Sequence, residues 1–265
     1  MKEIITSLQN PKVKDLVRFR NKSGKISENT VLIEDEREIL RAIDAGIEFS
    51  EVYVCEELVG KAGKDTLSRV LKRTSAAFYL SKAVFEKAAY KSDPFGIIIK
   101  ADFTAKKFKD IPDSENFILV AERIEKPGNL GALIRTADGA GIKTVILADR
   151  ITDNRNPNVI RASTGTIFAK IIAEASTEET VCYLKDKGYR IVSADPYAET
   201  IYYDADLTGK VAVVVGSEAF GLSEEMKKNA DVLVSIPMKG IADSLNVNQA
   251  ATIILYEALR QRSVK

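Results

Sequence analysis

Residues 211–226 read VAVVVGSEAFGLSEEM, and this stretch decides the fold class. Five consecutive apolar residues without polar alternation are typical of a strand that is buried on both faces of a parallel sheet. The strand runs directly into Gly216-Ser217-Glu218, and Ser223 then has the residue type of a helix N-cap, with two glutamates after it. We therefore expect an α/β fold in which buried strands alternate with helices.

The rest of the chain repeats this alternation in two parts that a charged stretch separates. Short apolar runs alternate with helical periodicity over the first hundred residues, and again from residue 116 onward. Residues 105–115 lose that periodicity and include Pro112. We predict a smaller α/β domain over 1–104, a linker over 105–115 and a domain with a parallel sheet over 116–265.

Composition excludes several kinds of chemistry. The 265 residues include no His, so catalysis by a Ser-His-Asp or Cys-His set and imidazole-ligated zinc are absent, and we expect no metal. Cys55 and Cys182 lie far apart without CxxC spacing, which indicates two reduced, packed thiols and a cytoplasmic protein. The N-terminal stretch lacks the apolar core of a signal peptide, and no apolar run is long enough to cross a bilayer, so we expect no membrane partner.

Charge is segregated along the chain although the net charge is only +1. Residues 1–25 carry seven Lys and Arg against two acids, residues 26–60 carry two against ten, and residues 61–100 carry nine against three. Such blocks are either solvated faces or contacts to a polyanion. A basic helix is predicted over Pro11 to Arg20, and its candidate phosphate contacts are Lys12, Lys14, Arg18 and Arg20.

Polar residues follow three of the predicted strands in the second domain, where an open parallel sheet binds its ligands. In ERIEKPGNLGALIRTADGAG (122–141), Asn129 can cap the following helix, and Arg135 suits either a salt bridge or an anion contact. After the strand at 211–215, Gly216 permits close approach of a ligand and Glu218 projects at the edge of the sheet. The alternative for these two residues is a tight turn with a solvated glutamate.

The third polar stretch lies in VLVSIPMKGIADSLNVNQAATIILYEALRQR (232–262), where Ser244 and Asn246 precede the final helix. Asn246 and Gln249 also have the spacing of a capping box, which needs no function. The helix is apolar on more than one stripe, which points to burial on two sides and to a subunit interface. The residues that widen its apolar face are Ile253, Leu255, Tyr256 and Leu259.

Together, NLGALIRTADGAG (129–141), VVVGSEAFGLSEE (213–225) and SIPMKGIADSLNVNQAA (235–251) resemble, in order, three motifs of the SpoU (TrmH) family of S-adenosylmethionine-dependent RNA ribose 2′-O-methyltransferases. The likeness is close over residues 116–265. SLQNPKVKDL (7–16) and VLIEDEREILRAIDAG (31–46) more weakly resemble the family's substrate RNA-binding domain, a fold similar to a ribosomal-protein RNA-binding fold.

The resemblance implies a SPOUT-type parallel sheet with a deep trefoil knot, S-adenosylmethionine as cofactor, and a homodimer with the C-terminal helix at its interface. The positions that match the family's cofactor contacts are Gly216, Ile236 and Leu245. Those that match its polar active-site positions are Asn129, Arg135, Glu218, Ser244 and Asn246. The implied reaction is transfer of a methyl group to a ribose 2′-hydroxyl of structured RNA, with ribosomal RNA preferred. The alternatives are tRNA as substrate, or a non-catalytic RNA-binding ribosome-assembly protein that keeps the fold.

Overall fold

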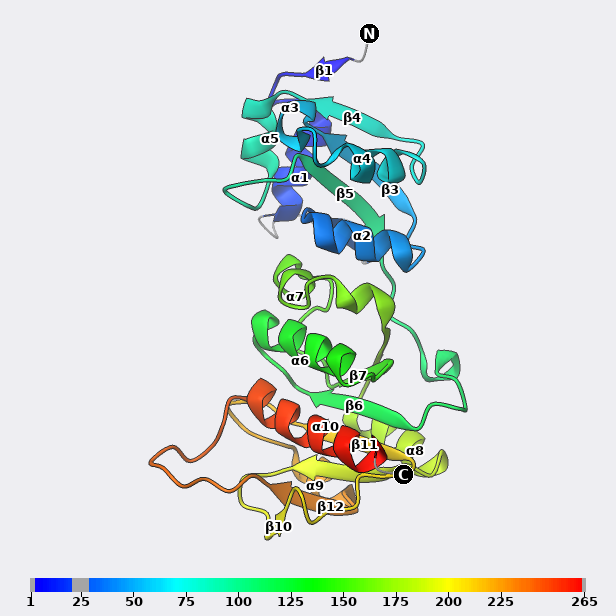
Figure 1. The fold of residues 1–265 in the computed structure, drawn as a ribbon, viewed down its shortest axis with the longest axis vertical. Helices are drawn as coiled ribbons and strands as arrows, with labels where there is room; N and C mark the ends of the chain where they lie inside the picture. Colours follow the sequence, from blue (N-terminus) through cyan, green and yellow to red (C-terminus); the bar gives the residue numbers. More distant parts are fainter. Residues whose placement is uncertain (1–2, 21–28, 264–265) are drawn as a thin grey trace. The chain divides into compact units, whose positions relative to one another are not determined.

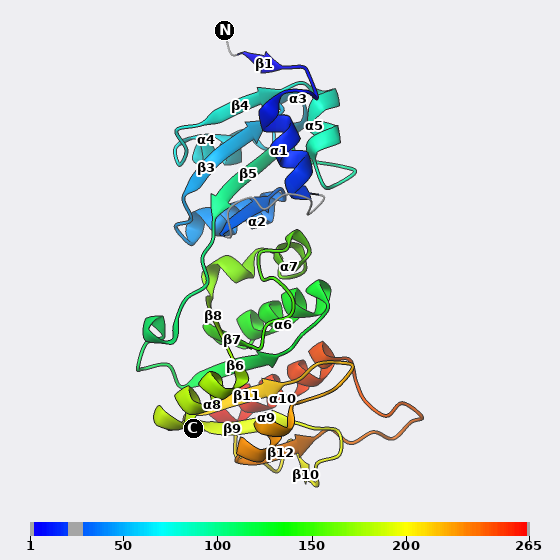
Figure 2. The same ribbon diagram turned by 180° about the vertical axis from the view of Figure 1, so that it is seen from behind.

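The computed structural model describes residues 3–20 and 29–263, and the chain divides into two compact units, Met1–Thr104 and Ala105–Lys265. Figures 1 and 2 show the elements of both units. Residues 105–115 belong to the second unit, where Ile111 is buried in the core and Lys106 bridges to Ala173.

The first unit is built on a mixed five-stranded sheet of order β1-β4-β3-β5-β2. β4 pairs in parallel with β1 and β3, whereas β5 runs antiparallel to β3 and β2. Its strands are β1 (Ile4–Ile5), β2 (Thr30–Ile33), β3 (Phe49–Val54), β4 (Ala77–Leu80) and β5 (Ile97–Asp102). Its helices are α1 (Pro11–Arg20), α2 (Glu36–Asp44), α3 (Glu56–Val59), α4 (Lys64–Leu71) and α5 (Lys82–Ala88).

Two features of the first unit follow directly from the sequence. The predicted helix over residues 11–20 is confirmed as α1, which buries Val13 and Leu16 in the core of the unit. The chain leaves α2 through Gly46, whose φ of 75° lies in the left-handed region that glycine adopts without strain. The amide of Gly46 donates to the carbonyl of Ile43 at 3.1 Å, and the amide of Ile47 donates to the carbonyl of Ala42 at 3.0 Å, which ends the helix.

The second unit contains a seven-stranded sheet of order β10-β12-β9-β11-β6-β7-β8, in which every neighbouring pair is parallel. The predicted parallel sheet is therefore confirmed. The deep trefoil knot stays a prediction, because strand order does not test it. The strands are β6 (Phe117–Glu122), β7 (Thr144–Ala148), β8 (Ile171–Ala175), β9 (Arg190–Ala194), β10 (Thr200–Ile201), β11 (Val211–Val215) and β12 (Val232–Ser235).

Helices cover both faces of this sheet, as Figures 1 and 2 show from opposite sides. α6 and α10 pack together on one face, and α8 and α9 lie on the other. The helical segments are α6 (Pro127–Gly139), α7 (Pro157–Ala162), α8 (Thr177–Asp186), α9 (Glu224–Asn229) and α10 (Val247–Ser263), with short 3-10 turns η1 (Phe108–Asp110) and η2 (Thr166–Ala169).

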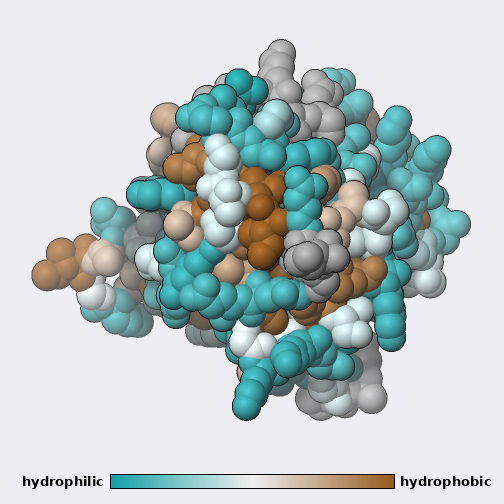
Figure 3. Space-filling model, turned by 90° about the horizontal axis from the view of Figure 1, so that it is seen from above, coloured by the Kyte–Doolittle hydropathy of each residue, from teal (hydrophilic) through white to brown (hydrophobic). Residues whose placement is uncertain are grey.

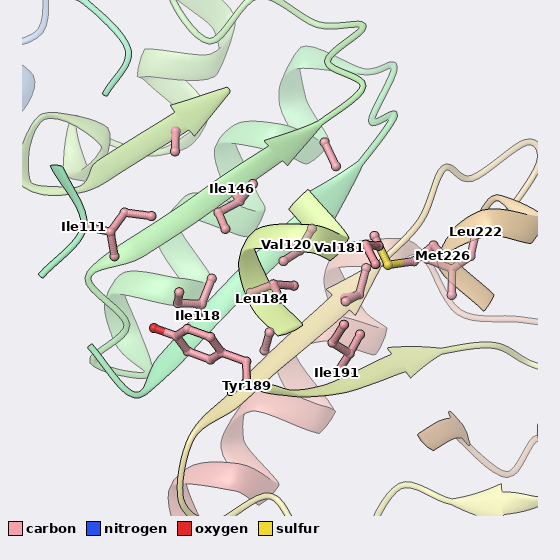
Figure 4. Close-up of a cluster of buried hydrophobic side chains, with 14 residues drawn as sticks. Ile111, Ile118, Val120, Ile146, Val181, Leu184, Tyr189, Ile191, Leu222 and Met226 are labelled. Carbon is pink, nitrogen blue, oxygen red and sulfur yellow. The ribbon is translucent and has the colours of Figure 1, made fainter. Parts of the chain in front are cut away.

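The double coverage explains the unalternating strands. All five residues of β11 are buried, and so are all six of β6. Figure 4 shows the core on the side of α8 and α9, a buried cluster that includes Val120 and Ile146 from the sheet, Leu184 from α8 and Met226 from α9. Residues that alternate with these along the strands, such as Leu119, face the opposite helix layer. This explains the run of apolar residues without polar alternation in β11 and in the first five residues of β6.

The cysteine prediction is correct for one residue and wrong for the other. Both cysteines are free, and Cys55 is buried in the core of the first unit as predicted. Cys182 is exposed on α8. It lies between Val181, which packs into the core, and Tyr183, so its position on the amphipathic helix turns it outward.

Candidate active site

The strand order brings the three polar stretches to one edge of the sheet. β11 lies between β6 and β9, and β12 pairs with β9 on the far side. Because all four strands are parallel, their carboxyl ends point to the same edge. The loops that follow β6, β9, β11 and β12 therefore meet there although they are far apart in sequence.

A cavity of about 570 Å³ opens at this edge. Its volume lies in the range of pockets that enclose small-molecule ligands, ~300–1,000 Å³. All three residues that match the family's cofactor contacts, Gly216, Ile236 and Leu245, line it, as do Glu218, Ser244 and Asn246 from the proposed polar set. The cavity has both apolar and polar walls, which suits a nucleoside-type cofactor such as S-adenosylmethionine.

Glycine is needed at position 216 for a reason that differs from the one expected from the sequence. A Cβ at this position would lie 2.5 Å from the backbone carbon of Gly221 and 2.6 Å from the amide nitrogen of Leu222. The loop after β11 folds back on itself, with the amide of Gly221 donating to the carbonyl of Ser217 at 2.9 Å. Glycine is thus required for the loop to close and to present its backbone to the cavity.

The carboxylate of Glu218 connects the three polar stretches. Its Oε1 accepts hydrogen bonds from Nδ2 of Asn129 and, at 2.8 Å, from Nδ2 of Asn246. Its Oε2 pairs with Nζ of Lys126 at 2.7 Å. The side chain is only 20% exposed, so the alternative of a freely solvated glutamate is wrong. One carboxylate therefore holds the loops after β6 and β11 and the start of α10 in a fixed arrangement.

Lys126 belongs to this cluster but was not among the predicted residues. Its hydrogen bond to Glu218 and the charge of that carboxylate raise the pKa of the lysine. Lys126 also lines the cavity and is 71% exposed, so its ammonium is accessible from solution. The Lys-Pro-Gly turn alone gave no signal for this role, because its partner lies 92 residues later in the chain.

The expected cap by Asn129 is wrong. α6 begins at Pro127 with Lys126 at the N-cap position, and Asn129 lies within the first turn. Proline is favoured at the first helical position because its missing amide hydrogen has no helical partner there. This shift frees the amide group of Asn129 for Glu218.

Asn246 has both of the roles that its sequence context left open, because it caps a helix and also belongs to the polar site. Its Oδ1 accepts a hydrogen bond from the amide of Asn248 at 3.0 Å, which caps the start of α10. Its Nδ2 donates to Glu218, so the same side chain also belongs to the polar cluster. Ser244 lies two residues earlier, exposed on the wall of the cavity.

Arg135 lies apart from these residues. It is exposed on α6, does not line the cavity, and pairs with no acidic group in residues 3–20 or 29–263. Asp138, three positions later, pairs with Lys170 at 2.7 Å instead. An exposed guanidinium without a carboxylate partner suits an anion contact better than a structural salt bridge.

Asp195, which directly follows β9, is a second cavity residue that sequence reasoning missed. It is 7% exposed, and its Oδ2 pairs with Nζ of Lys227 at 2.9 Å. Burial raises the pKa of Asp195, but hydrogen bonds from Lys227 and the amide of Tyr197 bring it below its ordinary value. Its place at the end of a strand, in SAD (193–195), was the available signal.

The residues of α1 that were proposed to contact RNA have different environments in the structure. Lys12 pairs with Glu51 and lies 4.9 Å from the centre of the Phe78 ring, so it is part of the packing of its own unit. Lys14 is exposed, and Arg18 is 64% exposed with Asp15 at 3.6 Å. The side chain of Arg20 falls outside the described residues.

Three further features concern the surface, metal ions and membranes. Figure 3 shows hydrophobic groups within a largely hydrophilic face, and single exposed apolar residues such as Ile4 and Leu8 are ordinary. In the described part of the chain, no group of three or more acidic or Cys side chains is placed to hold a metal ion. Among helices of residues 3–20 and 29–263, none combines the length and apolar character needed to cross a membrane.

Comparison with known proteins finds similar methyltransferases. The 23S rRNA (guanosine-2′-O-)-methyltransferase RlmB of Xylella fastidiosa is 32% identical over 240 residues, which cover 85% of this chain and 96% of that protein. A solved RNA 2′-O ribose methyltransferase is 38% identical with a TM-score of 0.84, over 98% of this chain and 99% of that one. The AdoMet-bound rRNA methyltransferase from Sinorhizobium meliloti is 28% identical with a TM-score of 0.88, over 97% of each chain.

Family models match both units. A model described as an MRM3-like substrate binding domain matches residues 10–99. The model described as the SpoU rRNA Methylase family matches residues 116–256, which include the cavity and the polar cluster around it. The chain therefore belongs to the SpoU rRNA methylase family.

Proposed function

We propose that this protein transfers a methyl group from S-adenosylmethionine to a ribose 2′-hydroxyl of structured RNA, with ribosomal RNA as the substrate. The observation that carries the proposal is the carboxylate of Glu218, which gathers Asn129, Asn246 and Lys126 at the rim of a 570 Å³ cavity. Family membership supports the reaction, and the name of one relative, a 23S rRNA (guanosine-2′-O-)-methyltransferase, supports the substrate class.

The cofactor would be held by the loop after β11 and the segment before α10, through Gly216, Ile236 and Leu245. When bound, S-adenosylmethionine supplies an electrophilic methyl group on a sulfonium. The polar side chains of the site then have to align the ribose hydroxyl with that methyl group, because methyl transfer is an in-line displacement. We assign this orientation to Asn129, Ser244 and Asn246.

The oxygens of Glu218 already accept from three donors, so we assign it the role of organising the site rather than of general base. Arg135 is a poor base, since a guanidinium remains protonated at any physiological pH. We propose that Arg135 anchors the phosphate next to the target ribose and stabilises the developing oxyanion, while the proton leaves to that phosphate or to water.

We also infer a homodimer with α10 at its interface. Ile253 and Leu259 are only half-buried and Tyr256 is 47% exposed, whereas Leu255 is fully buried in the core. The stripe of partly exposed apolar residues, together with the position of Arg135 outside the cavity, supports a site completed by a second subunit. Light scattering on the wild type and on Tyr256→Glu tests this, and a wild type that is monomeric at all concentrations would contradict it.

We assign substrate binding to the first unit, over residues 1–104, and methyl transfer to 116–265. The match of residues 10–99 to a substrate-binding domain supports this division. Among the described side chains of α1, Lys14 and Arg18 are exposed cations that phosphates can reach. The reduced cysteines agree with a cytoplasmic location.

The decisive experiment uses ribosomal RNA and tRNA from a strain that lacks the protein. Each RNA is incubated with the enzyme and tritium-labelled S-adenosylmethionine, and the modified position is mapped by alkaline fragmentation, since a 2′-O-methylated ribose resists cleavage. Label in ribosomal RNA supports the proposal, and label only in tRNA moves the substrate to the first alternative. RNA binding without transfer of label to either would make the protein a non-catalytic binder.

A further inference from the structure

Asp195 lines the cavity at a position that the strand register fixes. β9 lies between β12 and β11, and Val234 of β12 is paired with Ala194, while Val214 of β11 is paired with Ser193. The residue after Ala194 therefore lies between the starts of the two loops that carry Ile236 and Gly216. The amide of Asp195 donates to the carbonyl of Val234 at 3.0 Å, which fixes its backbone there.

The carboxylate of Asp195 is held rigidly but is not saturated. Oδ1 accepts from the amide of Tyr197 at 2.9 Å, and Oδ2 accepts from Nζ of Lys227 at 2.9 Å. A carboxylate has about four acceptor positions, so about two remain, and Asp195 lines the cavity. Its side chain is only 8% exposed, so these remaining positions are poorly supplied with bulk water.

The charge of the pair decides which ligand group suits it. Lys227 already balances the negative charge of Asp195, so a second cation gains little there, and a phosphate or carboxylate would be repelled by the aspartate. A neutral hydroxyl donor can use the free lone pairs without adding charge. The neighbouring walls include apolar and aromatic groups, Ile236, Leu245 and Tyr197, which suit the base of a nucleoside.

We propose that Asp195, positioned by Lys227, accepts a hydrogen bond from a ribose hydroxyl of the cofactor and so selects a ribonucleoside in the cavity. The proposal rests on the proposed function, because it takes S-adenosylmethionine as the ligand of this cavity. It adds a side chain that recognises the cofactor to the three positions already assigned to cofactor binding, Gly216, Ile236 and Leu245.

The test is isothermal titration calorimetry with S-adenosylhomocysteine and its 2′-deoxy and 3′-deoxy analogues, without RNA. For the wild type, we expect one of the two deoxy analogues to bind at least about 10-fold more weakly than the parent. Asp195→Asn should weaken the parent by about 10- to 100-fold and should no longer discriminate against that analogue. Asp206→Asn is the matched control, since Asp206 is also ion-paired, with Arg190 at 2.8 Å, but does not line the cavity.

Equal affinity of the wild type for the parent and both deoxy analogues would overturn the inference without any variant. Deoxy discrimination that persists unchanged in a folded Asp195→Asn would also overturn it, since another group would then contact the hydroxyl. Should Asp195→Asn fail to fold, Lys227→Met keeps the carboxylate, and we expect it to bind more weakly but still to discriminate. A wild type that does not discriminate between the parent and the deoxy analogues thus rejects only this inference. A wild type that binds neither S-adenosylhomocysteine nor S-adenosylmethionine rejects the proposed function.

Discussion

Nδ2 of Asn246 lies 2.8 Å from Oε1 of Glu218, although the two residues come from different loops, 28 positions apart. Asn129, from the start of α6, donates to the same oxygen. A single acceptor thus sets the relative positions of two side chains that we assign to orienting the ribose. The accuracy of the site therefore depends on one carboxylate.

Glu218→Gln is expected to lower kcat for methyl transfer by about 100-fold, because misplacement of orienting groups by about 1 Å has that effect. The variant keeps the size of the side chain but loses the ion pair with Lys126 and one of its acceptor oxygens. Steady-state transfer of label at saturating RNA measures this. Glu224→Gln, at an exposed carboxylate in the first turn of α9, is the control and should keep full activity. Full turnover by Glu218→Gln would show that the cluster does not set the geometry of the reaction.

Arg135→Lys is expected to lower kcat by about 100- to 1,000-fold, as loss of an oxyanion-stabilising donor does, because an ammonium cannot reproduce the two-point geometry of a guanidinium. Binding of S-adenosylhomocysteine should be unchanged, since Arg135 does not line the cavity. Kinetics at saturating RNA and calorimetry with the cofactor product separate the two effects. Near-full turnover by the lysine variant would mean that charge alone suffices at this position.

Gly131→Ala is expected to destabilise the second unit by ~1–3 kcal/mol through overpacking. An added Cβ would lie 2.4 Å from the carbonyl oxygen of Val159 and 2.6 Å from Cβ of Ala162, so α6 and α7 would have to move apart. Gly128, in the same helix, has nothing within 4 Å of an added Cβ, and Gly128→Ala should be neutral or stabilising by up to ~1 kcal/mol. Urea denaturation followed by circular dichroism compares the two, and equal stability of both variants would contradict the packing argument.

Lys12→Gln is expected to reduce stability near neutral pH by up to ~1 kcal/mol, with little of that loss remaining in acid. Burial raises the pKa of Glu51, but hydrogen bonds from Lys12 and Tyr53 and the charge of Lys100 lower it below its ordinary value of 4.5 overall. A carboxylate with a lowered pKa stabilises the fold above its unfolded pKa and loses that contribution as the pH falls through the folded value. Denaturation of wild type and variant from pH 7 to pH 3 measures the difference.

Lys14→Gln provides the contrast, because Lys14 is exposed and takes no part in this network. It should leave stability unchanged and should weaken RNA binding with a shallower dependence on salt, since one phosphate contact is lost. A stability loss in Lys14→Gln that equals that of Lys12→Gln would contradict the distinction. An unchanged salt dependence would remove Lys14 from the RNA interface.

The sequence predicts individual strands and helices better than it predicts which residues the fold brings together. The unalternating VAVVV run indicates a doubly covered strand, because burial on both faces leaves no place for polar residues, and β11 has that environment. Lys126 and Asp195 escape prediction for a different reason. Their positions depend on strand order, which places β9 between β11 and β12 and β6 beside β11, and no local pattern encodes that order. The cap of α6 is misplaced by three residues, because both Lys126 and Asn129 precede plausible helical runs and only the proline geometry decides between them.

The position of β12 and the loop after it has a consequence for the chain while it is being synthesised. A nascent chain that ends before residue 232 contains β6, β7, β8, β9 and β11, which are neighbours in the sheet of the complete chain. It lacks Ile236, Leu245 and Asn246, which come from one wall of the cavity and from the polar cluster. Five of the seven strands are therefore synthesised before the residues that complete the cavity, and a product that terminates prematurely at this point would lack one of its walls.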